Sequence, residues 1–346
     1  ARAMTEEMGK PISQARAEVD KCAWVCAYYA DNAESMLEPE QIASDATVSY
    51  VRFDPIGPVL AVMPWNFPFW QVFRFAAPAL MAGNTALLKH ASNVPRCALL
   101  IEEVFRRAGF TEGCFQTLMI SSSAVADVIA HPAVRAVTLT GSEYAGSQVA
   151  AAAGKDVKKT VLELGGSDPF IVLDDADVEN AARTGATARM INTGQSCIAA
   201  KRFIVTDAVA ERFTAQFVEA LRAMRMGDPM DADTEGGGVR GKNLLLELDG
   251  QVRTSLRAGA TLLLGGKRRP GVGVFYEPTV VSGVRKGMPL YDEETFGPAA
   301  ALITVRDEEE AIAVANDSAF GLGASLGTQD SARARRLASR IEAGAV

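Results

Sequence analysis

The stretch VRAVTLTGSEYAGSQVAAAAGKDVKKTVLELGG, residues 134–166, decides the fold class. Residues 134–140 and 160–164 are rich in valine, leucine and threonine, which is typical of buried β-strands. The alanine-rich residues 145–153 between them, which end at Gly154, are typical of a helix. A strand, a helix and a second strand in this order predict the crossover unit of a parallel sheet.

The same alternation continues in both directions along the chain. Before this stretch we predict strands at 59–63, 85–88 and 115–120 and helices at 73–82, 95–108 and 124–130. After it we predict strands at 170–173, 203–205, 261–264, 280–281 and 300–305, helices at 178–190, 210–224, 252–258, 308–315 and 332–342, and a loop at 228–243.

Apolar strands that alternate with helices indicate parallel sheets covered on both faces. We therefore expect an α/β fold with two domains. Residues 1–165 would form a Rossmann-like parallel-sheet domain, and residues 166–346 a second α/β domain. Residues 1–36 read as a helix broken near 9–11. Residues 42–55 are β-rich, with a strand at 47–53 that looks detached from both sheets.

Composition excludes several classes of function. The 346 residues carry a formal net charge of −7 and no long basic run, so we expect no nucleic-acid partner. No apolar run reaches the length of a membrane span, and we expect no membrane partner. Both ends interrupt amphipathic or apolar patterns, and we read the chain as an internal portion of a longer polypeptide.

The cysteine and histidine counts restrict the chemistry. The five cysteines show neither a disulfide framework nor a zinc-binding spacing, which predicts reduced thiols and a cytoplasmic location. With only His90 and His131, a multi-histidine metal site is hard to build, and we expect no metal. Base chemistry is therefore sought among the carboxylates.

Cys197 is the candidate nucleophile. A free cysteine is usually a small buried apolar residue, and Cys22, Cys97 and Cys114 fit that reading. Cys197 differs because it follows the polar, glycine-containing loop NTGQS at 192–196, where a thiol would be accessible.

Two polar side chains placed just after predicted strands could assist it. Glu163, at the end of strand 160–164 and beside Gly165 and Gly166, could be a helix cap or a surface charge, or a general base whose pKa partial burial would raise. Asn66, in PWNFP at 64–68, could be a turn residue or an oxyanion donor. Ser142 could be a helix N-cap, or the place where backbone amides meet a phosphate.

Four motifs together resemble the aldehyde dehydrogenase superfamily. They are PWNFP at 64–68, ELGG at 163–166, GQSC at 194–197 and ETFGP at 294–298, in the family's order and spacing, and the likeness covers nearly the whole chain. The resemblance implies oxidation of an aldehyde to a carboxylic acid through a cysteine thioester, with NAD or NADP as cofactor. It also implies that the domain of residues 1–165 binds the cofactor and that the domain of residues 166–346 carries catalysis.

The resemblance also implies a role for each matching residue. Cys197 would be the nucleophile, Asn66 and the Cys197 amide the oxyanion hole, and Glu163 the base for the deacylating water. Lys89 and Glu294 would bind the cofactor riboses, and Trp65, Ser142 and Phe296 would line the cofactor cleft. The remaining residues expected at the cofactor are Met63, Pro64, Ser92, Gly141, Leu164 and Gly165.

Within the family, the segments KHASNV at 89–94, NFPFWQVFR at 66–74 and ELGGSDPF at 163–170 resemble bacterial succinate-semialdehyde dehydrogenases. Arg74 would bind the distal carboxylate of the substrate, since a guanidinium suits a carboxylate, and Trp70 and Ser196 would line the substrate site. The alternative is that Arg74 is a solvated helix residue and that the substrate is another short aldehyde, or another ω-carboxy aldehyde such as glutarate semialdehyde.

The chain also departs from its relatives. A second arginine that some carry six residues before the nucleophile is Ile191 here, and a redox cysteine two residues after it is Ala199. The glycine-rich segment at the start of residues 235–249 departs from the family's pattern. Ser92 replaces a glutamate that NAD-selective relatives use, which predicts that NADP⁺ is tolerated as well as NAD⁺.

Two further alternatives stay open. A CoA-acylating enzyme would lack the base that Glu163 supplies, and a non-catalytic homologue would not need Cys197, Glu163 and Asn66 together. Residues 42–55 resemble the family's intersubunit arm, so we expect a homodimer or homotetramer.

Overall fold

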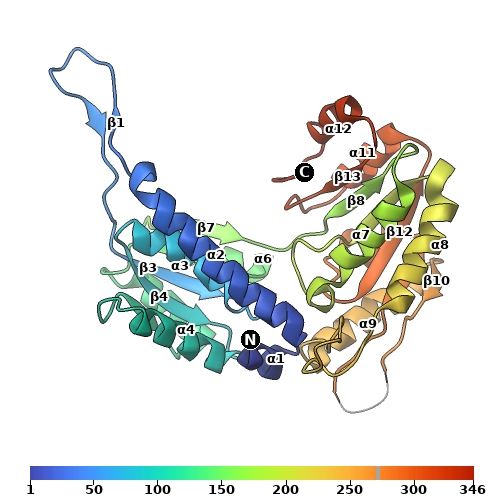
Figure 1. The fold of residues 1–346 in the computed structure, drawn as a ribbon, viewed down its shortest axis with the longest axis horizontal. Helices are drawn as coiled ribbons and strands as arrows, with labels where there is room; N and C mark the ends of the chain where they lie inside the picture. The colour runs from blue at the N-terminus through green and yellow to red at the C-terminus, as the bar shows by residue number, and fades with distance from the viewer. Residues whose placement is uncertain (270–272) are drawn as a thin grey trace. The chain divides into compact units, whose positions relative to one another are not determined.

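The computed structural model describes residues 1–269 and 273–346 and divides the chain into two compact units. The first unit consists of residues 1–7 and 15–164, and the second of residues 8–14 and 165–346. Figure 1 shows the course of the chain through each unit.

The first unit is built on a five-stranded parallel sheet in the order β5-β4-β3-β6-β7. Its strands are β3 (Pro58–Met63), β4 (Thr85–His90), β5 (Phe115–Thr117), β6 (Ala136–Thr140) and β7 (Lys159–Glu163). The chain leaves β3 towards β4 and β5, then returns to β6 on the other side of β3. The strand order therefore reverses between β3 and β6, and in such sheets ligands bind outside the carboxyl ends of the strands at this point.

The helices of this unit follow the same two directions. α3 (Trp70–Met81) and α4 (Pro95–Arg107) contact β3, β4 and β5, whereas α6 (Glu143–Lys155) contacts β6 and β7 and packs with α5 (Val125–Ala130). Between α5, α6 and the sheet lies an apolar core made of Leu60, Val125, Ile129, Val134, Val137, Leu139, Val149 and Ala153. Both faces of the sheet are covered, as the apolar strands predict.

The N-terminal helical region is broken as expected, into α1 (Arg2–Met8) and α2 (Ile12–Met36). The expected boundary at residue 165 is one residue from the division found, but residues 8–14 belong with the second unit rather than the first. Three hydrogen bonds explain this. Ile12 N–H donates to the Pro229 carbonyl at 2.7 Å, Gln14 Nε2 to the Glu235 carbonyl at 2.9 Å, and Asn192 N–H to Gln14 Oε1 at 2.7 Å.

The β-rich segment is shorter than predicted. Instead of a strand over 47–53, the structure has the two-residue strands β1 (Glu40–Gln41) and β2 (Tyr50–Val51), which pair with each other in an antiparallel hairpin. The hairpin projects away from the five-stranded sheet of its own unit (Figure 1). The hairpin ladder reaches only as far as the hydrogen bond from Ile42 N–H to the Ser49 carbonyl, at 2.9 Å.

The second unit contains a six-stranded sheet in the order β10-β11-β12-β9-β8-β13. All its pairings are parallel except β10 with β11. Its strands are β8 (Pro169–Val172), β9 (Arg202–Thr206), β10 (Thr261–Leu264), β11 (Thr279–Ser282), β12 (Ala299–Val305) and β13 (Ser325–Gly327).

Side chains alternate between two cores on opposite faces of this sheet. Phe203 of β9 packs with helices α7 (Val178–Met190) and α8 (Asp207–Ala223), while the next residue, Ile204, packs with α9 (Lys242–Arg257), α11 (Glu308–Asn316) and α12 (Ser331–Ala338). This period of two is what a strand buried on both faces produces.

Three predictions in this unit need correction. α9 begins at Lys242, ten residues before the predicted start, because Leu245, Leu248 and Val252 form one buried helical stripe through Gly250. α12 ends at Ala338 rather than 342. The short elements α10 (Pro289–Asp292) and β13 were not predicted, since they are too brief to show a periodic pattern.

Candidate active site

Asn66 lies in the loop that follows β3, at the carboxyl edge of the five-stranded sheet. Only 5% of the residue is exposed. Met63, which ends β3, is buried, while Pro64 and Trp65 are partly buried. The loop leads directly into α3, whose first residue is Trp70. An amide held in a buried loop has the rigidity that an oxyanion donor needs.

Two buried side chains, His90 and Glu18, hold this loop through hydrogen bonds to its backbone. His90, at the end of β4, lies 2.9 Å from the Pro68 carbonyl through Nε2, and its Nδ1 accepts the Ala91 N–H at 2.9 Å. Burial lowers the pKa of His90, which favours the uncharged ring that this arrangement requires. Glu18 of α2 accepts the N–H groups of Phe69 and Trp70, both at 2.9 Å, and so caps α3.

Glu163 and Arg74 meet at the same edge. Thr140 and Glu163 are register partners at the ends of β6 and β7. Arg74 of α3 donates from Nη2 to Thr140 Oγ1 at 3.2 Å, and its Nη1 lies 3.7 Å from Glu163 Oε2. The two side chains are 38% and 42% exposed, so both remain accessible from solvent. The ion pair holds a carboxylate and a guanidinium together at the point where the fold favours ligand binding.

A cavity of about 500 Å³ lies over the same sheet, between α5 and α6. Lys89 of β4 contributes to its lining, and burial lowers the pKa of that lysine. The other lining residues are mostly apolar or small and include Val62, Ser122, Val125, Ile129, Leu139, Tyr144, Gln148 and Val149. An apolar cavity with two lysines, Lys89 and Lys155, and a few hydroxyls fits the adenosine part of a dinucleotide.

The remaining expected cofactor residues of this unit lie around that edge. Ser142 is the N-cap of α6, with Oγ accepting the Ala145 N–H at 3.3 Å, so the capping role is what its hydroxyl performs in the structure. Gly141 N–H donates to the Glu163 carbonyl at 3.0 Å. Ser92 is exposed in the turn after β4, and Leu164 is partly buried at the end of β7.

In the second unit, Cys197 follows a turn with unusual backbone geometry. Asn192, Thr193 and Gly194 all have positive φ, at 54°, 57° and 74°. Left-handed geometry at a residue other than glycine costs about 1–3 kcal/mol, more so for the β-branched threonine. A side chain on Gly194 would place its Cβ 2.2 Å from the Gly297 carbonyl oxygen. Residues 192–196 are buried while Cys197 is only partly buried, so the turn ends on an accessible thiol.

The glycine-rich segment, which the sequence left unexplained, supports this turn. Gly237 N–H donates to Thr193 Oγ1 at 3.0 Å, and Arg240 N–H donates to Gln195 Oε1 at 2.8 Å. A Cβ on Gly237 would lie 2.3 Å from the Gly9 carbonyl oxygen, so only glycine allows the two backbones to approach. The glycine-rich segment therefore stabilises the strained turn through these two hydrogen bonds.

Two buried cations also hold the turn. Arg189 of α7 is fully buried and donates from Nη2 to the Gly194 carbonyl at 2.6 Å and to the Thr295 carbonyl at 3.4 Å. Lys201 is 1% exposed, and its Nζ donates to the carbonyls of Ser196 and Cys197 at 2.9 and 2.7 Å, and also to that of Ala199. The Arg189 guanidinium therefore donates to backbone carbonyls of the protein itself.

Glu294 and Phe296 lie on the segment that contacts this turn. Glu294 Oε1 accepts the Gly166 N–H at 3.1 Å and lies 3.9 Å from Lys201 Nζ. A Cβ on Gly165 would meet Glu294 Oε2 at 2.6 Å. Phe296 is partly buried. The structure thus brings together two motifs that are far apart in the chain. They are ELGG, through Gly165 and Gly166, and ETFGP, through Glu294.

The expected substrate residues are placed as follows. Trp70, partly buried, has its ring 4.1 Å from Lys21 Nζ in a cation–π contact. Ser196 is 2% exposed, with its carbonyl held by Lys201. Ile191, which stands where some relatives have an arginine, is exposed.

The other cysteines are poor candidates for a nucleophile. All five are free. Burial raises the pKa of Cys97, Cys26 and Cys114, which disfavours their thiolates, and Cys22 is buried in the core.

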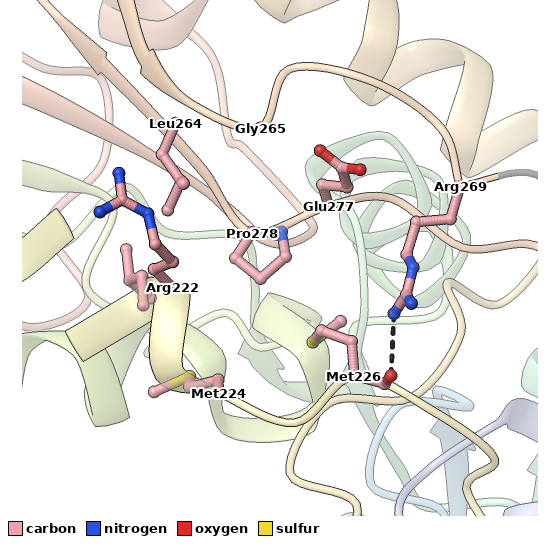
Figure 2. A pocket seen from close by; sticks show the side chains of 9 residues that line it. Arg222, Met224, Met226, Leu264, Gly265, Arg269, Glu277 and Pro278 are labelled. Atoms are coloured by element: carbon pink, nitrogen blue, oxygen red, sulfur yellow. Dashed lines mark hydrogen bonds between the residues drawn. The ribbon is translucent and has the colours of Figure 1, made fainter. Parts of the chain in front are cut away.

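A second cavity, of about 410 Å³, lies in the second unit near the end of α8 and β10. Figure 2 shows Arg269 reaching from it to the Met226 carbonyl, a 2.8 Å hydrogen bond, beside Glu277 and Pro278. None of the candidate residues lines this cavity. Among the described residues no group of three or more metal-ligating side chains is found, and no described helix is long and apolar enough to cross a membrane.

Comparisons with known proteins agree with these features. The model of the aldehyde dehydrogenase family matches residues 1–346. A probable NADP(+) succinate-semialdehyde dehydrogenase of Synechocystis is 53% identical over 346 residues, which are 100% of this chain and 76% of that protein. An NADP(+) succinate-semialdehyde dehydrogenase of Mycobacterium avium is 52% identical over 349 residues, 100% of this chain and 74% of that protein.

A solved structure is similarly close. The succinic semialdehyde dehydrogenase from Streptococcus pyogenes, in complex with NADP⁺ as the cofactor, matches with a TM-score of 0.97 at 40% identity, over 99% of this chain and 76% of that one. The chain belongs to the aldehyde dehydrogenase family. Within it, the chain is an NAD(P)-dependent aldehyde dehydrogenase, and it spans about three quarters of the length of these relatives.

Proposed function

We propose that this enzyme oxidises succinate semialdehyde to succinate, with NADP⁺ or NAD⁺ as cofactor. The observation that carries the substrate assignment is the position of Arg74, whose accessible guanidinium lies 3.7 Å from Glu163. A fixed cation beside the base can pair with a carboxylate at the far end of a short aldehyde. The names of the two curated relatives support the same substrate.

The proposed mechanism gives each candidate residue one task. The Cys197 thiolate adds to the aldehyde carbon, and the resulting oxyanion accepts hydrogen bonds from the Asn66 amide and the Cys197 N–H. The bound nicotinamide supplies the hydride acceptor. Loss of hydride leaves a thioester on Cys197. Glu163 then takes a proton from water, which attacks the thioester, releases the carboxylate product and frees the thiolate.

The cofactor would be held chiefly by the first unit. The cavity between α5 and α6 would take the adenosine, with Lys89 at the ribose, and the loop from Met63 to Trp65 and the N-terminus of α6 would line the cleft. Gly165, Glu294 and Phe296 would contribute from the second unit. Val125, Ile129, Gln148 and Val149, which also line the cavity, were not expected from sequence because nothing in their local pattern marks them as more than helix residues.

Replacing Arg74 by alanine tests the substrate assignment. We expect kcat/KM for succinate semialdehyde to fall about 10²-fold, because charge-assisted hydrogen bonds to the carboxylate are worth about 1.5–3 kcal/mol. The rate with butanal, which has no carboxylate, should fall much less. Arg74→Lys, which keeps the charge but loses the guanidinium fork, should lie between. Equal losses with both aldehydes would mean that Arg74 acts only through Glu163 and Thr140.

Ser92 is expected to permit NADP⁺. Its side chain is exposed and uncharged, so it does not repel a 2′-phosphate. We expect the ratio of kcat/KM for NAD⁺ over NADP⁺ to stay below about 10³, which is about 4 kcal/mol. Ser92→Glu should lower kcat/KM for NADP⁺ about tenfold or more through charge repulsion, and leave NAD⁺ nearly unaffected. A wild-type preference for NAD⁺ above that limit would contradict the expectation.

We also propose that the hairpin of β1 and β2 mediates a homodimer or homotetramer, as the resemblance implies. Several apolar side chains of the hairpin region are exposed, including Ile42, Val48, Tyr50 and Val51, at 44–67%. Sedimentation of Val48→Asp/Val51→Asp should show a smaller species than the wild type, whereas Val161→Asp, exposed on β7, should not. An unchanged mass would contradict the role of the hairpin. We also propose a cytoplasmic location, because none of the five cysteines forms a disulfide.

A further inference from the structure

A lysine ammonium is buried directly beneath the turn that carries Cys197. Lys201 is 1% exposed, and its Nζ lies 2.9 Å from the carbonyl oxygen of Ser196, 2.7 Å from that of Cys197 and 3.0 Å from that of Ala199. Three acceptors match the three N–H donors of a charged ammonium, whereas a neutral amine has only two. The arrangement therefore requires the charged form in spite of its burial.

The charge is compensated only in part by nearby carboxylates. Glu294 Oε1 is 3.9 Å away, and Asp168 interacts with Lys201 from the segment before β8, where its Oδ1 accepts the Gly323 N–H at 3.2 Å. Two other buried cations face the same region, Arg189 from α7 and, next to Asp168, Arg202 from β9. Burial is the main cause that lowers the pKa of Lys201 and raises that of Asp168.

The ammonium and the thiol interact with each other. The Cys197 thiolate contributes to raising the pKa of Lys201, so by reciprocity the Lys201 charge favours the thiolate. The four carbonyl contacts made by Lys201 and Arg189 on residues 194–199 fix the distance over which this attraction acts. Neither cation was singled out in the sequence, because a lysine just before an apolar strand usually marks a solvated strand end.

We propose that Lys201 is a positioning residue for the reaction: its buried ammonium holds the turn at 196–199 and favours the thiolate form of Cys197, and the negative charge of Asp168 moderates its effect. This rests on the proposed role of Cys197 as nucleophile. Lys201 touches neither substrate nor the reacting thiol in this scheme. It acts through the backbone it clamps and through its electrostatic field.

Alkylation of Cys197 by iodoacetamide, followed by mass spectrometry of its peptide across a pH series, tests the proposal without substrate or cofactor. Two variants should shift the pH of the inflection in the alkylation rate, and in opposite directions. Lys201→Met, which removes the cation, should raise it by about one pH unit or more. Asp168→Asn, which removes the anion but keeps an oxygen for the Gly323 N–H, should lower it. Lys242→Met, an exposed lysine at the start of α9, is the matched control and should leave it unchanged.

A lysine that serves only to hold the turn would change the plateau rate and leave the inflection in place. An unmoved inflection in Lys201→Met therefore overturns the proposal, as does an unmoved or raised inflection in Asp168→Asn. If Lys201→Met does not fold, Asp168→Asn decides alone, since its predicted direction is opposite to that of general destabilisation. Failure of the nucleophile role would be seen separately, as aldehyde oxidation that survives Cys197→Ala.

Discussion

Replacing Cys197 by alanine is expected to lower kcat for aldehyde oxidation by at least about 10⁴-fold, because no other group can form the covalent intermediate. Binding of NADP⁺, measured by quenching of tryptophan fluorescence, should be unchanged, since the expected cofactor contacts do not involve the thiol. The measurement is the steady-state rate of NADPH formation with succinate semialdehyde.

Cys114→Ala is the matched control for that experiment. Cys114 is also a free, partly buried thiol, but burial raises its pKa and it lies outside the nucleophile turn. We expect it to retain wild-type activity. A Cys197→Ala enzyme that kept more than a small fraction of its activity would rule out thioester chemistry at this residue and reopen the reading as a homologue with a different reaction.

Glu163→Gln should separate the two halves of the reaction. Without the carboxylate, acylation can proceed once, but water is no longer activated to release the product. We expect a burst of NADPH equal to the enzyme concentration, followed by a steady-state rate lower by about 10²–10⁴-fold. Stopped-flow absorbance at the NADPH band measures both phases.

The ion pair between Arg74 and Glu163 has to be considered in interpreting Glu163→Gln. The Glu163 carboxylate is paired with Arg74, so the amide also removes an ion pair of two half-exposed side chains, which is worth little for stability. The free energy of unfolding should therefore be nearly unchanged in Glu163→Gln. Glu211→Gln, at an exposed acidic residue of α8, is the control and should behave alike. Loss of the burst together with turnover would assign Glu163 to acylation instead.

The sequence predicts the five-stranded sheet of the first unit well because its central strands β3, β4 and β6 are largely apolar and the helices between the strands have clear ends. Because its five strands are parallel, their carboxyl ends meet at one sheet edge, where Asn66, Lys89, Ser142 and Glu163 lie. The same reasoning cannot locate Cys197, which precedes β9 rather than following a strand. Its identification needed its polar loop and the resemblance of the motif.

What escaped prediction depends on contacts between residues that are distant in sequence. Lys201, Arg189 and His90 look like ordinary polar residues in the chain, and only tertiary structure shows that they bind backbone carbonyls in the interior. Gly237 is similar, because its importance comes from the approach of Gly9. The strand predicted over 47–53 was too long, because β-propensity alone does not supply a partner strand.

The most direct test of the proposed chemistry is to trap the thioester. Glu163→Gln enzyme should be incubated with succinate semialdehyde and NADP⁺, quenched in acid, digested, and analysed by mass spectrometry. We predict one succinyl group on the peptide that contains Cys197, in an amount that matches the NADPH burst, and none when NADP⁺ is omitted. A burst without an adduct on Cys197, or an adduct on another cysteine, would contradict the assignment of Cys197 as the nucleophile.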